Sequence, residues 1–346
     1  MAANLVPAIN PNMNHFEHIQ KTFVLEHLPA NIRASQFMGR WPFIRRWQRL
    51  PVGLGFLPAE GRFTYQRAGQ NHNVKFNGRN LQYHALYEPR YRYGYELETA
   101  LLIATLCRDK KAFFDIGANW GYFSLLAAAL PDFSGSIYAF EPNPRTFADL
   151  TSTLKQAAVV DRVTACQLGV GRTACDMTVA EADHFNTGLS RLTASGGGHK
   201  IPVKPVDLLE FEPPGFMKID AEGMELEVLM GARRTLANAK PFVVIENFLD
   251  FQAPRKTYAA MDFLREGGYR IFVPVLEFSL KGSPVLVTYG QDYTSIVKGA
   301  GQPKLGVVEI SIQRRFLLGE QLNLLAVHAS RIEELWKLGI SDMGKM

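Results

Sequence analysis

The chain has 346 residues, of which 47% are hydrophobic and 21% are charged, and its formal net charge is +5 at pH 7. This length exceeds the roughly 100–200 residues of one typical domain, and the composition excludes a broadly disordered chain. The small positive excess does not indicate a nucleic-acid-binding protein. We therefore expect one large domain with an appendage, or two modest domains, and no nucleic-acid partner.

The cysteines and the N-terminus indicate the compartment. Cys107, Cys166 and Cys175 form neither CxxC pairs nor a Cys/His metal-binding spacing, which fits a reducing compartment. No stretch approaches the roughly 18 apolar residues that span a bilayer. The first 20 residues lack the charged and apolar regions of a signal peptide. We expect a cytoplasmic protein without a transmembrane segment, and a homo-oligomer remains open.

Near the N-terminus, residues 33–49 interleave five arginines with Phe37, Trp41, Phe43 and Trp47. Such a segment can bind phosphate, a glycan or a membrane surface. It can also be a packing arm whose aromatic side chains dock on the main domain while its arginines stay solvated. We favour the packing arm, and the prolines at positions 42 and 51 argue against one long helix.

Residues 61–88 have a β pattern, with an expected hairpin turn at Asn77-Gly78. The apolar spacing then predicts a helix over Tyr95–Cys107. We therefore divide the chain into an N-terminal extension, residues 1–94, with a basic–aromatic arm and a β-hairpin, and a main domain, residues 95–346.

The main domain alternates strands and helices, as in a mostly parallel sheet with helices on both faces. Amphipathic helices are expected over Tyr122–Leu130, Arg145–Ala157 and Glu225–Ala237, and an insertion over residues 280–319. The seven expected strands are Ala112–Ile116, Ser136–Phe140, Val163–Leu168, Phe216–Ile219, Phe242–Ile245, Arg270–Val275 and Asn323–His328.

The sharpest motif is FFDIGANWGYF at residues 113–123, where a strand ends in Asp115 and Gly117 and Gly121 bracket a tight turn into a helix. A dinucleotide-binding loop would read GxGxxG and hold a pyrophosphate at the helix start. Here the middle glycine is missing, and an acidic residue would repel pyrophosphate while suiting a cationic, amino-acid-like ligand. The loop therefore indicates S-adenosylmethionine rather than NAD.

Glu141 ends the next strand, 26 residues after Asp115. A carboxylate at this position can accept hydrogen bonds from both ribose hydroxyls of a nucleotide. Alternatively, it complements the dipole of the helix that follows. The Asp115 loop favours the ribose role.

Two later strands also end in polar residues. Lys218, Asp220 and Glu222 reach the carboxyl edge of the sheet, where open α/β sheets bind ligands. A structural alternative pairs Lys218 with an acid and lets Glu222 cap the helix. Glu246 and Asn247 end the following strand and could join Asp220 as oxygen ligands of Mg²⁺. They could equally bind substrate hydroxyls without a metal, which we favour.

In order and spacing, these motifs resemble the FkbM-type S-adenosylmethionine-dependent methyltransferases over residues 87–328. The resemblance implies the class I methyltransferase fold, a Rossmann-like, seven-stranded, mostly parallel sheet. The matching pieces are DIGANWGYFSLL, IYAFEPNP, HFNTGLSRL, IPVKPVDLL, KIDAEGMELEVLMGA and FVVIEN.

The resemblance also implies residue roles. Asp220 and Glu222 would face the cofactor methyl group and the acceptor, and Glu96, in competition with Glu88 and Glu98, would reach the methionine end. The chain departs from the family at LGVGR, residues 168–172, so the adenine contact falls to Gln167 or to backbone groups. The implied cofactor loop and ribose contacts are Asp115, Gly117, Asn119, Gly121, Glu141, Pro142 and Asn143.

The implied reaction is O-methylation of a hydroxyl on a sugar, a glycoconjugate or a natural product. Because an alcohol is a poor acid, we expect a general base, with Asp220 ahead of Glu222, Glu246 and the loop residue His184. Competing hypotheses are a cofactor-binding protein without turnover, an NAD-dependent oxidoreductase, which the loop disfavours, and a methyltransferase acting on nucleic acid or protein.

Overall fold

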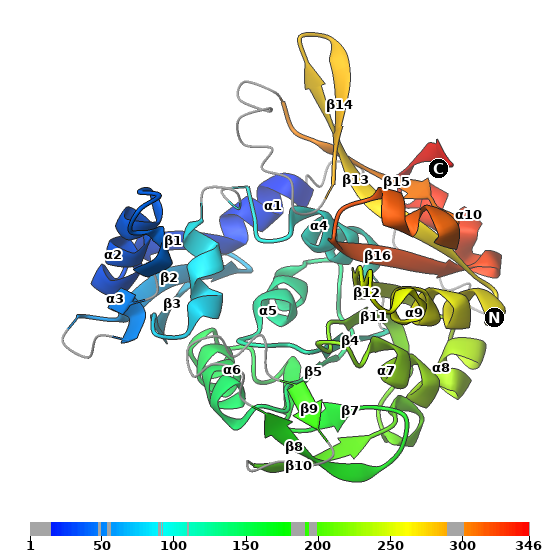
Figure 1. Cartoon of the computed structure of the whole chain (residues 1–346), viewed down its shortest axis with the longest axis horizontal. Helices are drawn as coiled ribbons and strands as arrows, with labels where there is room; N and C mark the ends of the chain where they lie inside the picture. Colours follow the sequence, from blue (N-terminus) through cyan, green and yellow to red (C-terminus); the bar gives the residue numbers. More distant parts are fainter. Residues whose placement is uncertain are drawn as a thin grey trace.

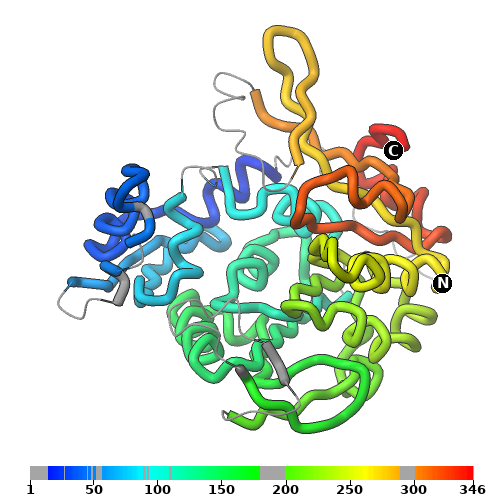
Figure 2. Tube along the Cα trace, viewed as in Figure 1, coloured from blue at the N-terminus to red at the C-terminus, as the bar shows by residue number. Residues whose placement is uncertain are grey.

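Figure 1 shows the computed structural model of the chain, which describes residues 15–47, 50–53, 57–88, 91, 93–108, 111–180, 191–193, 199–288 and 301–345. Most strands of the described residues belong to one large central sheet, and two smaller sheets flank it. The helices α2 (Ala30–Gly39) and α3 (Leu50–Gly53) lie at the opposite end of the long axis from the C-terminal strands (Figure 2).

All seven predicted strands are present in the central sheet. They run in the order β6-β5-β4-β11-β12-β16-β13, and only β16 is antiparallel to its neighbours among these seven. The chain starts at β4, winds outward to β6 and returns to β11, so the carboxyl ends of β4 and β11 form the switch point where α/β sheets bind ligands. The strands are β4 (Ala112–Ile116), β5 (Ile137–Phe140), β6 (Val163–Cys166), β11 (Pro214–Ile219), β12 (Phe242–Phe248), β13 (Tyr269–Leu280) and β16 (Gln321–His328).

The expected count of seven strands was too low, because the described sheet has ten. β13 continues to Leu280, turns at Lys281 and Gly282, which both have positive φ, and returns as β14 (Ser283–Val287). The expected insertion therefore begins as an extension of the sheet. β15 (Lys304–Glu309) pairs with β13, and β17 (Ser341–Lys345) completes this edge.

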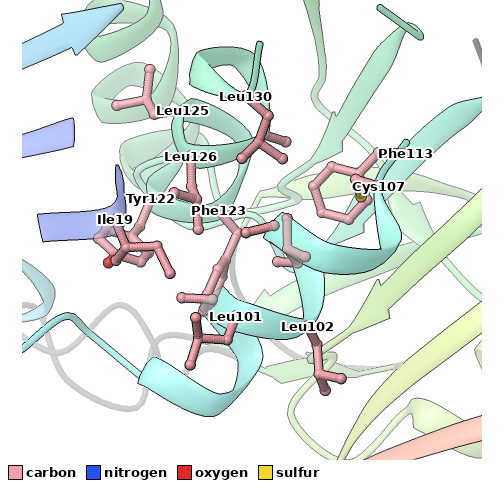
Figure 3. Packing of buried hydrophobic residues seen from close by; sticks show 14 of the residues in the cluster. Ile19, Leu101, Leu102, Cys107, Phe113, Tyr122, Phe123, Leu125, Leu126 and Leu130 are labelled. Atoms are coloured by element: carbon pink, nitrogen blue, oxygen red, sulfur yellow. The ribbon is translucent and has the colours of Figure 1, made fainter. Parts of the chain in front are cut away.

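Alternating side chains of the central strands build two hydrophobic layers. Phe113 of β4 packs into the layer under α4 and α5, whereas Phe114 packs into the opposite layer with α7 and α9. Figure 3 shows Leu101 of α4 close to Phe123 of α5 in the first layer. The helices are α4 (Leu97–Leu106), α5 (Tyr122–Ala129), α6 (Pro144–Gln156), α7 (Glu225–Gly231), α8 (Arg233–Asn238), α9 (Pro254–Glu266) and α10 (Ile332–Lys337).

The helix predicted over residues 225–237 is divided into α7 and α8. A Cβ atom on Gly231 would lie 2.0 Å from the backbone oxygen of Gly171, so only glycine allows this close approach.

A four-stranded sheet in the order β7-β10-β8-β9 lies next to α7. Its elements are β7 (Gly169–Val170), β8 (Cys175–Ala180), β9 (Arg191–Thr193) and β10 (Lys200–Lys204), followed by the 3-10 helix η5 (Val206–Leu208).

The N-terminal extension contains a three-stranded sheet, but its hairpin turn was misplaced. The turn is Ala68-Gly69, where both residues have positive φ, between β2 (Glu60–Arg67) and β3 (Gln70–Asn77). Gly78 instead donates its N–H to Ala59 O, and the chain continues into the 3-10 helix η2 (Leu81–Tyr87). The remaining elements are α1 (His15–Thr22) and β1 (Phe23–His27), which pairs with β2.

This sheet packs directly on the main domain. The Phe63 ring lies 5.8 Å from the Trp120 ring, and the Tyr65 hydroxyl donates to Leu125 O in α5. Both parts therefore share one hydrophobic cluster. The division of the chain after residue 94 stays a prediction.

The prediction of a packing arm was wrong. The segment forms α2 (Ala30–Gly39), the 3-10 helix η1 (Arg45–Trp47) and α3 (Leu50–Gly53), but its rings point outward. Phe37 is 59% exposed, Trp41 47%, Phe43 71% and Trp47 50%. Within the described residues, no helix is long and apolar enough to cross a membrane.

Candidate functional site

Acidic side chains gather at the carboxyl edge of the central sheet. Asp115 lies in β4 and Glu246 in β12, while Glu141 comes directly after β5 and Asp220 directly after β11. Each of these four carboxyl groups interacts electrostatically with at least one of the others. Glu96 joins them from the N-cap of α4. The structure therefore brings together carboxylates that are up to 150 residues apart in sequence.

The loop between β4 and α5 is held tightly against the end of β11. A Cβ atom on Gly117 would lie 1.8 Å from Asp220 O, and φ at Gly117 is +78°. Gly117 and Ala118 both donate their N–H groups to Phe140 O. Gly121, at φ +96°, is the N-cap of α5 and leaves no room for a Cβ beside Leu150. Glycines at these two positions let the backbone turn at the switch point.

Asp115 is fully buried at the end of β4. Its Oδ2 accepts a 2.6 Å hydrogen bond from the Ser124 hydroxyl, and its Oδ1 has no hydrogen-bond partner among the described residues. Burial raises the pKa of this carboxyl, although the Lys218 ammonium opposes the shift. A buried acceptor atom without a partner is costly, and a donor from a ligand would satisfy it.

Glu141 is fixed by two backbone donors. The N–H of Asn119 donates to Oε2 at 3.0 Å and the N–H of Asn143 donates to Oε1 at 2.8 Å. Asn143 also caps α6 by accepting from Arg145 N, and Pro142 lies between these two anchors. Burial raises the pKa of Glu141 to about 7, although the two amides favour its ionised form. The carboxylate is therefore rigid, and each oxygen retains capacity for one more donor.

Lys218 and Asp220 form a buried ion pair at the end of β11. The Lys218 Nζ lies 3.0 Å from Asp220 Oδ2 and 4.9 Å from the centre of the Phe123 ring. Burial alone would lower the pKa of this ammonium, but Asp220, Asp115 and Glu96 outweigh that effect and raise it. Lys218 is 4% exposed, whereas the Asp220 side chain is 27% exposed and can reach a ligand.

The turn after β11 is capped by a residue that sequence reasoning missed. Glu225 Oε1 accepts from the N–H groups of Ala221 and Gly223, so Glu225 fills the capping role considered for Glu222. Glu222 itself has a left-handed backbone, at φ +50°, and acts electrostatically on Glu246. Glu222 therefore lies near the cluster, and its catalytic role stays a prediction.

Glu246 and Glu96 are buried by partners from β16. Gln321 donates its amide N–H to Glu246 Oε1, and Asn323 donates to Glu96 Oε2 at 2.9 Å. Burial raises the pKa of both carboxyls, and Asp220 raises them further. Burial and the neighbouring carboxylates therefore favour the neutral form of Glu246. Of the acidic residues considered for the methionine end of the cofactor, Glu96 is the one beside Lys218 and Asp220.

The oxygen ligands considered for Mg²⁺ are not assembled. Asn247 Oδ1 accepts from the buried Arg315 side chain, and its Nδ2 donates to Thr257 O, so this amide is already committed. Across the described residues, no group of three His, Cys, Asp or Glu side chains could hold a metal ion. The Mg²⁺ hypothesis therefore has no support here.

The structure gives less information on the two remaining candidate residues, Gln167 and His184. Gln167 is exposed directly after β6, where the backbone N–H of Glu141 donates to Cys166 O. It therefore lies at the same sheet edge as Glu141, on the side away from β11. His184 falls outside the described residues, as does most of its loop.

The charge of the site indicates the ligand. Three carboxyl groups, those of Asp220, Asp115 and Glu96, act on the Lys218 ammonium. Burial raises the pKa of Asp115, Glu96, Glu141 and Glu246 in the same cluster. Burial, and secondly the neighbouring carboxylates, make ionisation of these groups unfavourable, and a bound cation would favour their ionised forms. The site therefore fits a cationic ligand better than a phosphate.

The family comparison agrees with this geometry. Residues 115–271 match the family model described as the methyltransferase FkbM domain. This chain carries an FkbM-type methyltransferase domain. Its central sheet agrees with the class I methyltransferase fold in being α/β and mostly parallel, although it has more strands than the seven expected. The match begins at Asp115 and ends within β13, so it contains four of the five clustered carboxylates.

Known proteins resemble the FkbM domain at low identity. Hexuronic acid methyltransferase AglP from Haloferax volcanii is 25% identical over 154 residues, which cover 44% of this chain and 62% of AglP. The match thus spans less than two thirds of that relative. Two solved structures also align. Methyltransferase FkbM from Methylobacillus flagellatus is 20% identical with a TM-score of 0.36, covering 70% of this chain and 54% of that chain. Precorrin-6y C5,15-methyltransferase from Geobacter metallireducens is 18% identical with a TM-score of 0.37, covering 68% and 88%.

Proposed function

We propose that the chain transfers a methyl group from S-adenosylmethionine to a hydroxyl oxygen of a sugar-containing acceptor. The carboxylate cluster at the switch point carries this proposal. Glu141 would bind the ribose hydroxyls, and Asp115 and Glu96 would face the cationic methionine portion. The sugar class is supported by the name of the AglP relative, a hexuronic acid methyltransferase.

Bound at this edge, S-adenosylmethionine would supply an electrophilic methyl group on a positively charged sulfur. The cluster would hold that charge, and the rigid β4–α5 loop would fix the orientation of the nucleoside. Positioning the acceptor oxygen in line with the methyl group is the largest contribution available here, because well-oriented reactants gain about 7–11 kcal/mol in favourable cases.

Removal of the hydroxyl proton falls to Asp220. Its side chain is the more exposed partner of the Lys218 pair, and it lies beside the buried carboxyl of Glu246. A cation bound nearby lowers the pKa of Glu246 and favours its ionised form. The proton released as the new O–C bond forms would then pass to Asp220, with Glu246 as the neighbouring group that shares it.

The test uses the purified chain, S-adenosylmethionine and a panel of hexoses and hexuronic acids, with release of S-adenosylhomocysteine as the readout. We expect turnover with a sugar hydroxyl. The Asp220→Asn variant should lose about 10²–10⁴-fold in turnover while binding S-adenosylhomocysteine normally, because it lacks only the proton acceptor. Cofactor binding without turnover on any hydroxyl, or transfer to nucleic acid or protein instead, would contradict the proposal.

The affinity for S-adenosylmethionine should rise about tenfold between pH 6 and pH 8. The pKa of Glu141 is about 7, so this carboxyl is mostly protonated at pH 6 and mostly ionised at pH 8. Only the ionised form accepts from both ribose hydroxyls while it keeps its two backbone donors. Titration calorimetry at pH 6, 7 and 8 checks this result, and an affinity independent of pH would contradict it.

Glu141 also determines the direction in which folding stability changes with pH. Its folded pKa is raised above the ordinary 4.5, so the stability that it contributes below pH 4.5 is lost as the pH rises through about 7. Because the cofactor affinity is expected to be higher at pH 8, S-adenosylmethionine should raise the melting temperature more at pH 8 than at pH 6.

A further inference from the structure

The α2–η1–α3 segment has a surface that the methyl-transfer site does not use. We define the basic–aromatic surface by its exposed side chains, which are Arg33, Phe37, Arg40, Trp41, Phe43, Arg46, Trp47 and Leu50. We propose that this surface docks the protein on an anionic lipid membrane. The proposal rests on the fold of the N-terminal segment and does not depend on the proposed reaction.

The rings are exposed although the segment is folded. Backbone hydrogen bonds run continuously through its turns, from Arg40 N to Phe37 O, from Trp41 N to Met38 O, from Ile44 N to Trp41 O and from Trp47 N to Ile44 O. The Trp41 and Phe43 rings lie 5.8 Å apart. Large apolar groups gathered on an ordered surface mark an interaction site rather than a defect of packing.

One face of α2 is anchored to the protein and the other is free for docking. Asn31 and Ile32 are fully buried, and the Asn31 amide donates to Gly78 O at 2.8 Å. Gln36 donates to Tyr87 O on the same side. The outward positions 33 and 37 lie one turn apart on α2, and Arg40, its C-cap, and Trp41 follow at the end of the helix. The outward side therefore combines two arginines with two aromatic rings.

The charge of the segment gives the kind of partner. Arg33, Arg40, Arg45, Arg46 and Arg49 are five of the 38 basic residues, so the rest of the chain has 33 basic and 33 acidic residues. The whole net charge of the protein therefore lies in these 17 residues. Between Glu26 and Glu60 the sequence has no acidic residue that could neutralise it. The described surface presents Arg33, Arg40 and Arg46 of this excess, and cations of this kind complement anionic headgroups.

The shape and the side-chain types favour a membrane over a nucleic acid. Figure 1 shows α2 and α3 at one end of the long axis, on the outer side of the β1–β3 sheet. A projecting end suits a flat surface, whereas single-stranded nucleic acid is bound in a positively charged groove. Tryptophan prefers the headgroup level of bilayers, and arginine can place its charged head among the headgroups while its aliphatic part lies deeper. Leu50, which is 53% exposed, adds an aliphatic group. Such a segment lies on a membrane rather than spanning it.

Vesicle co-sedimentation of the full chain tests the proposal. We expect binding to vesicles of phosphatidylcholine with one third phosphatidylglycerol, weak binding to phosphatidylcholine alone, and loss of binding in high salt. The fluorescence of Trp41 and Trp47 should shift to shorter wavelength on binding and be quenched by brominated lipid chains. Of the other two tryptophans, Trp120 is buried and Trp336 packs against the core on α10, so neither should give this signal.

Two double variants and a matched control separate the contributions. Arg40→Glu/Arg46→Glu should reduce vesicle binding at least tenfold, and Trp41→Ala/Phe43→Ala should weaken binding and leave only the fluorescence shift of Trp47. Arg255→Glu/Arg265→Glu makes the same charge change at exposed positions on α9 and should leave binding nearly unchanged. Absence of binding by the folded wild type, an equal loss in the α9 control, or preferential binding of a single-stranded RNA oligonucleotide would overturn the proposal.

Discussion

Replacing Lys218 by methionine is expected to lower the free energy of unfolding by about 3–5 kcal/mol at pH 8. Methionine fills a similar volume beside the Phe123 ring, but it removes the ammonium that faces Asp220, Asp115 and Glu96. These carboxylates would then be buried together without a counter-charge. The loss should be smaller at pH 5.5, because protonation of the carboxyl groups removes the repulsion.

Urea unfolding at both pH values measures this effect, and Lys256→Met is its matched control. Lys256 also faces an aspartate, with its Nζ 3.9 Å from Asp250 Oδ2, but its side chain is 79% exposed. Removing such a solvated pair should cost less than about 1 kcal/mol at either pH. A similar loss in both variants would show that the Lys218 ammonium has no special relation to the cluster.

The central sheet could be predicted from the sequence because its strands are short apolar runs that end in glycine, acid or amide residues. β4 coincides with its predicted bounds, and all of its residues are buried. The loop after it was also predictable, since Gly117 and Gly121 stand where a side chain would collide with Asp220 O or Leu150. Local sequence carries this information because the strand, the turn and the helix start are contiguous.

The partners that set the charges of the site could not be predicted in the same way. Asn323 meets Glu96 across 227 positions, and Gln321 meets Glu246 across 75. β16 is the antiparallel strand between β12 and β13, so only the sheet order brings its amides to the site. Arg315 similarly reaches Asn247 from a 3-10 helix, η6 (Ile312–Leu317), within the expected insertion.

Exposure was predicted least well. Residues 33–49 resemble a packing arm when hydrophobicity alone is considered, because aromatic side chains are usually buried. In the structure Asn31 and Ile32 provide the buried contact, and the rings face away from it. The helical spacing of Arg33, Phe37 and Arg40 was a signal for this, since it places charges and rings on one face.

Replacing Glu141 by glutamine is expected to weaken S-adenosylmethionine binding at least 100-fold at pH 8. The two carboxylate oxygens accept from Asn119 N–H and Asn143 N–H, and the ribose hydroxyls would add two further donors. Glutamine keeps the shape but offers one acceptor oxygen, and its own N–H₂ group would face a backbone donor. Because a hydrogen bond to a charged group contributes about 1.5–3 kcal/mol, losing one ribose hydrogen bond and the charge on the acceptor of the other accounts for this factor.

Folding stability distinguishes a lost ligand contact from a damaged loop. Burial raises the pKa of Glu141, so its ionised form is costly in the unliganded protein at pH 8, and glutamine removes that cost while it loses one backbone contact. The unliganded variant should therefore be about as stable as the wild type, although its cofactor affinity falls. Titration calorimetry and thermal unfolding measure the two quantities, with Glu266→Gln, an exposed position on α9, as the control. Unchanged affinity in Glu141→Gln, or an equal loss in Glu266→Gln, would remove Glu141 from the cofactor site and leave it as a structural support for the loop.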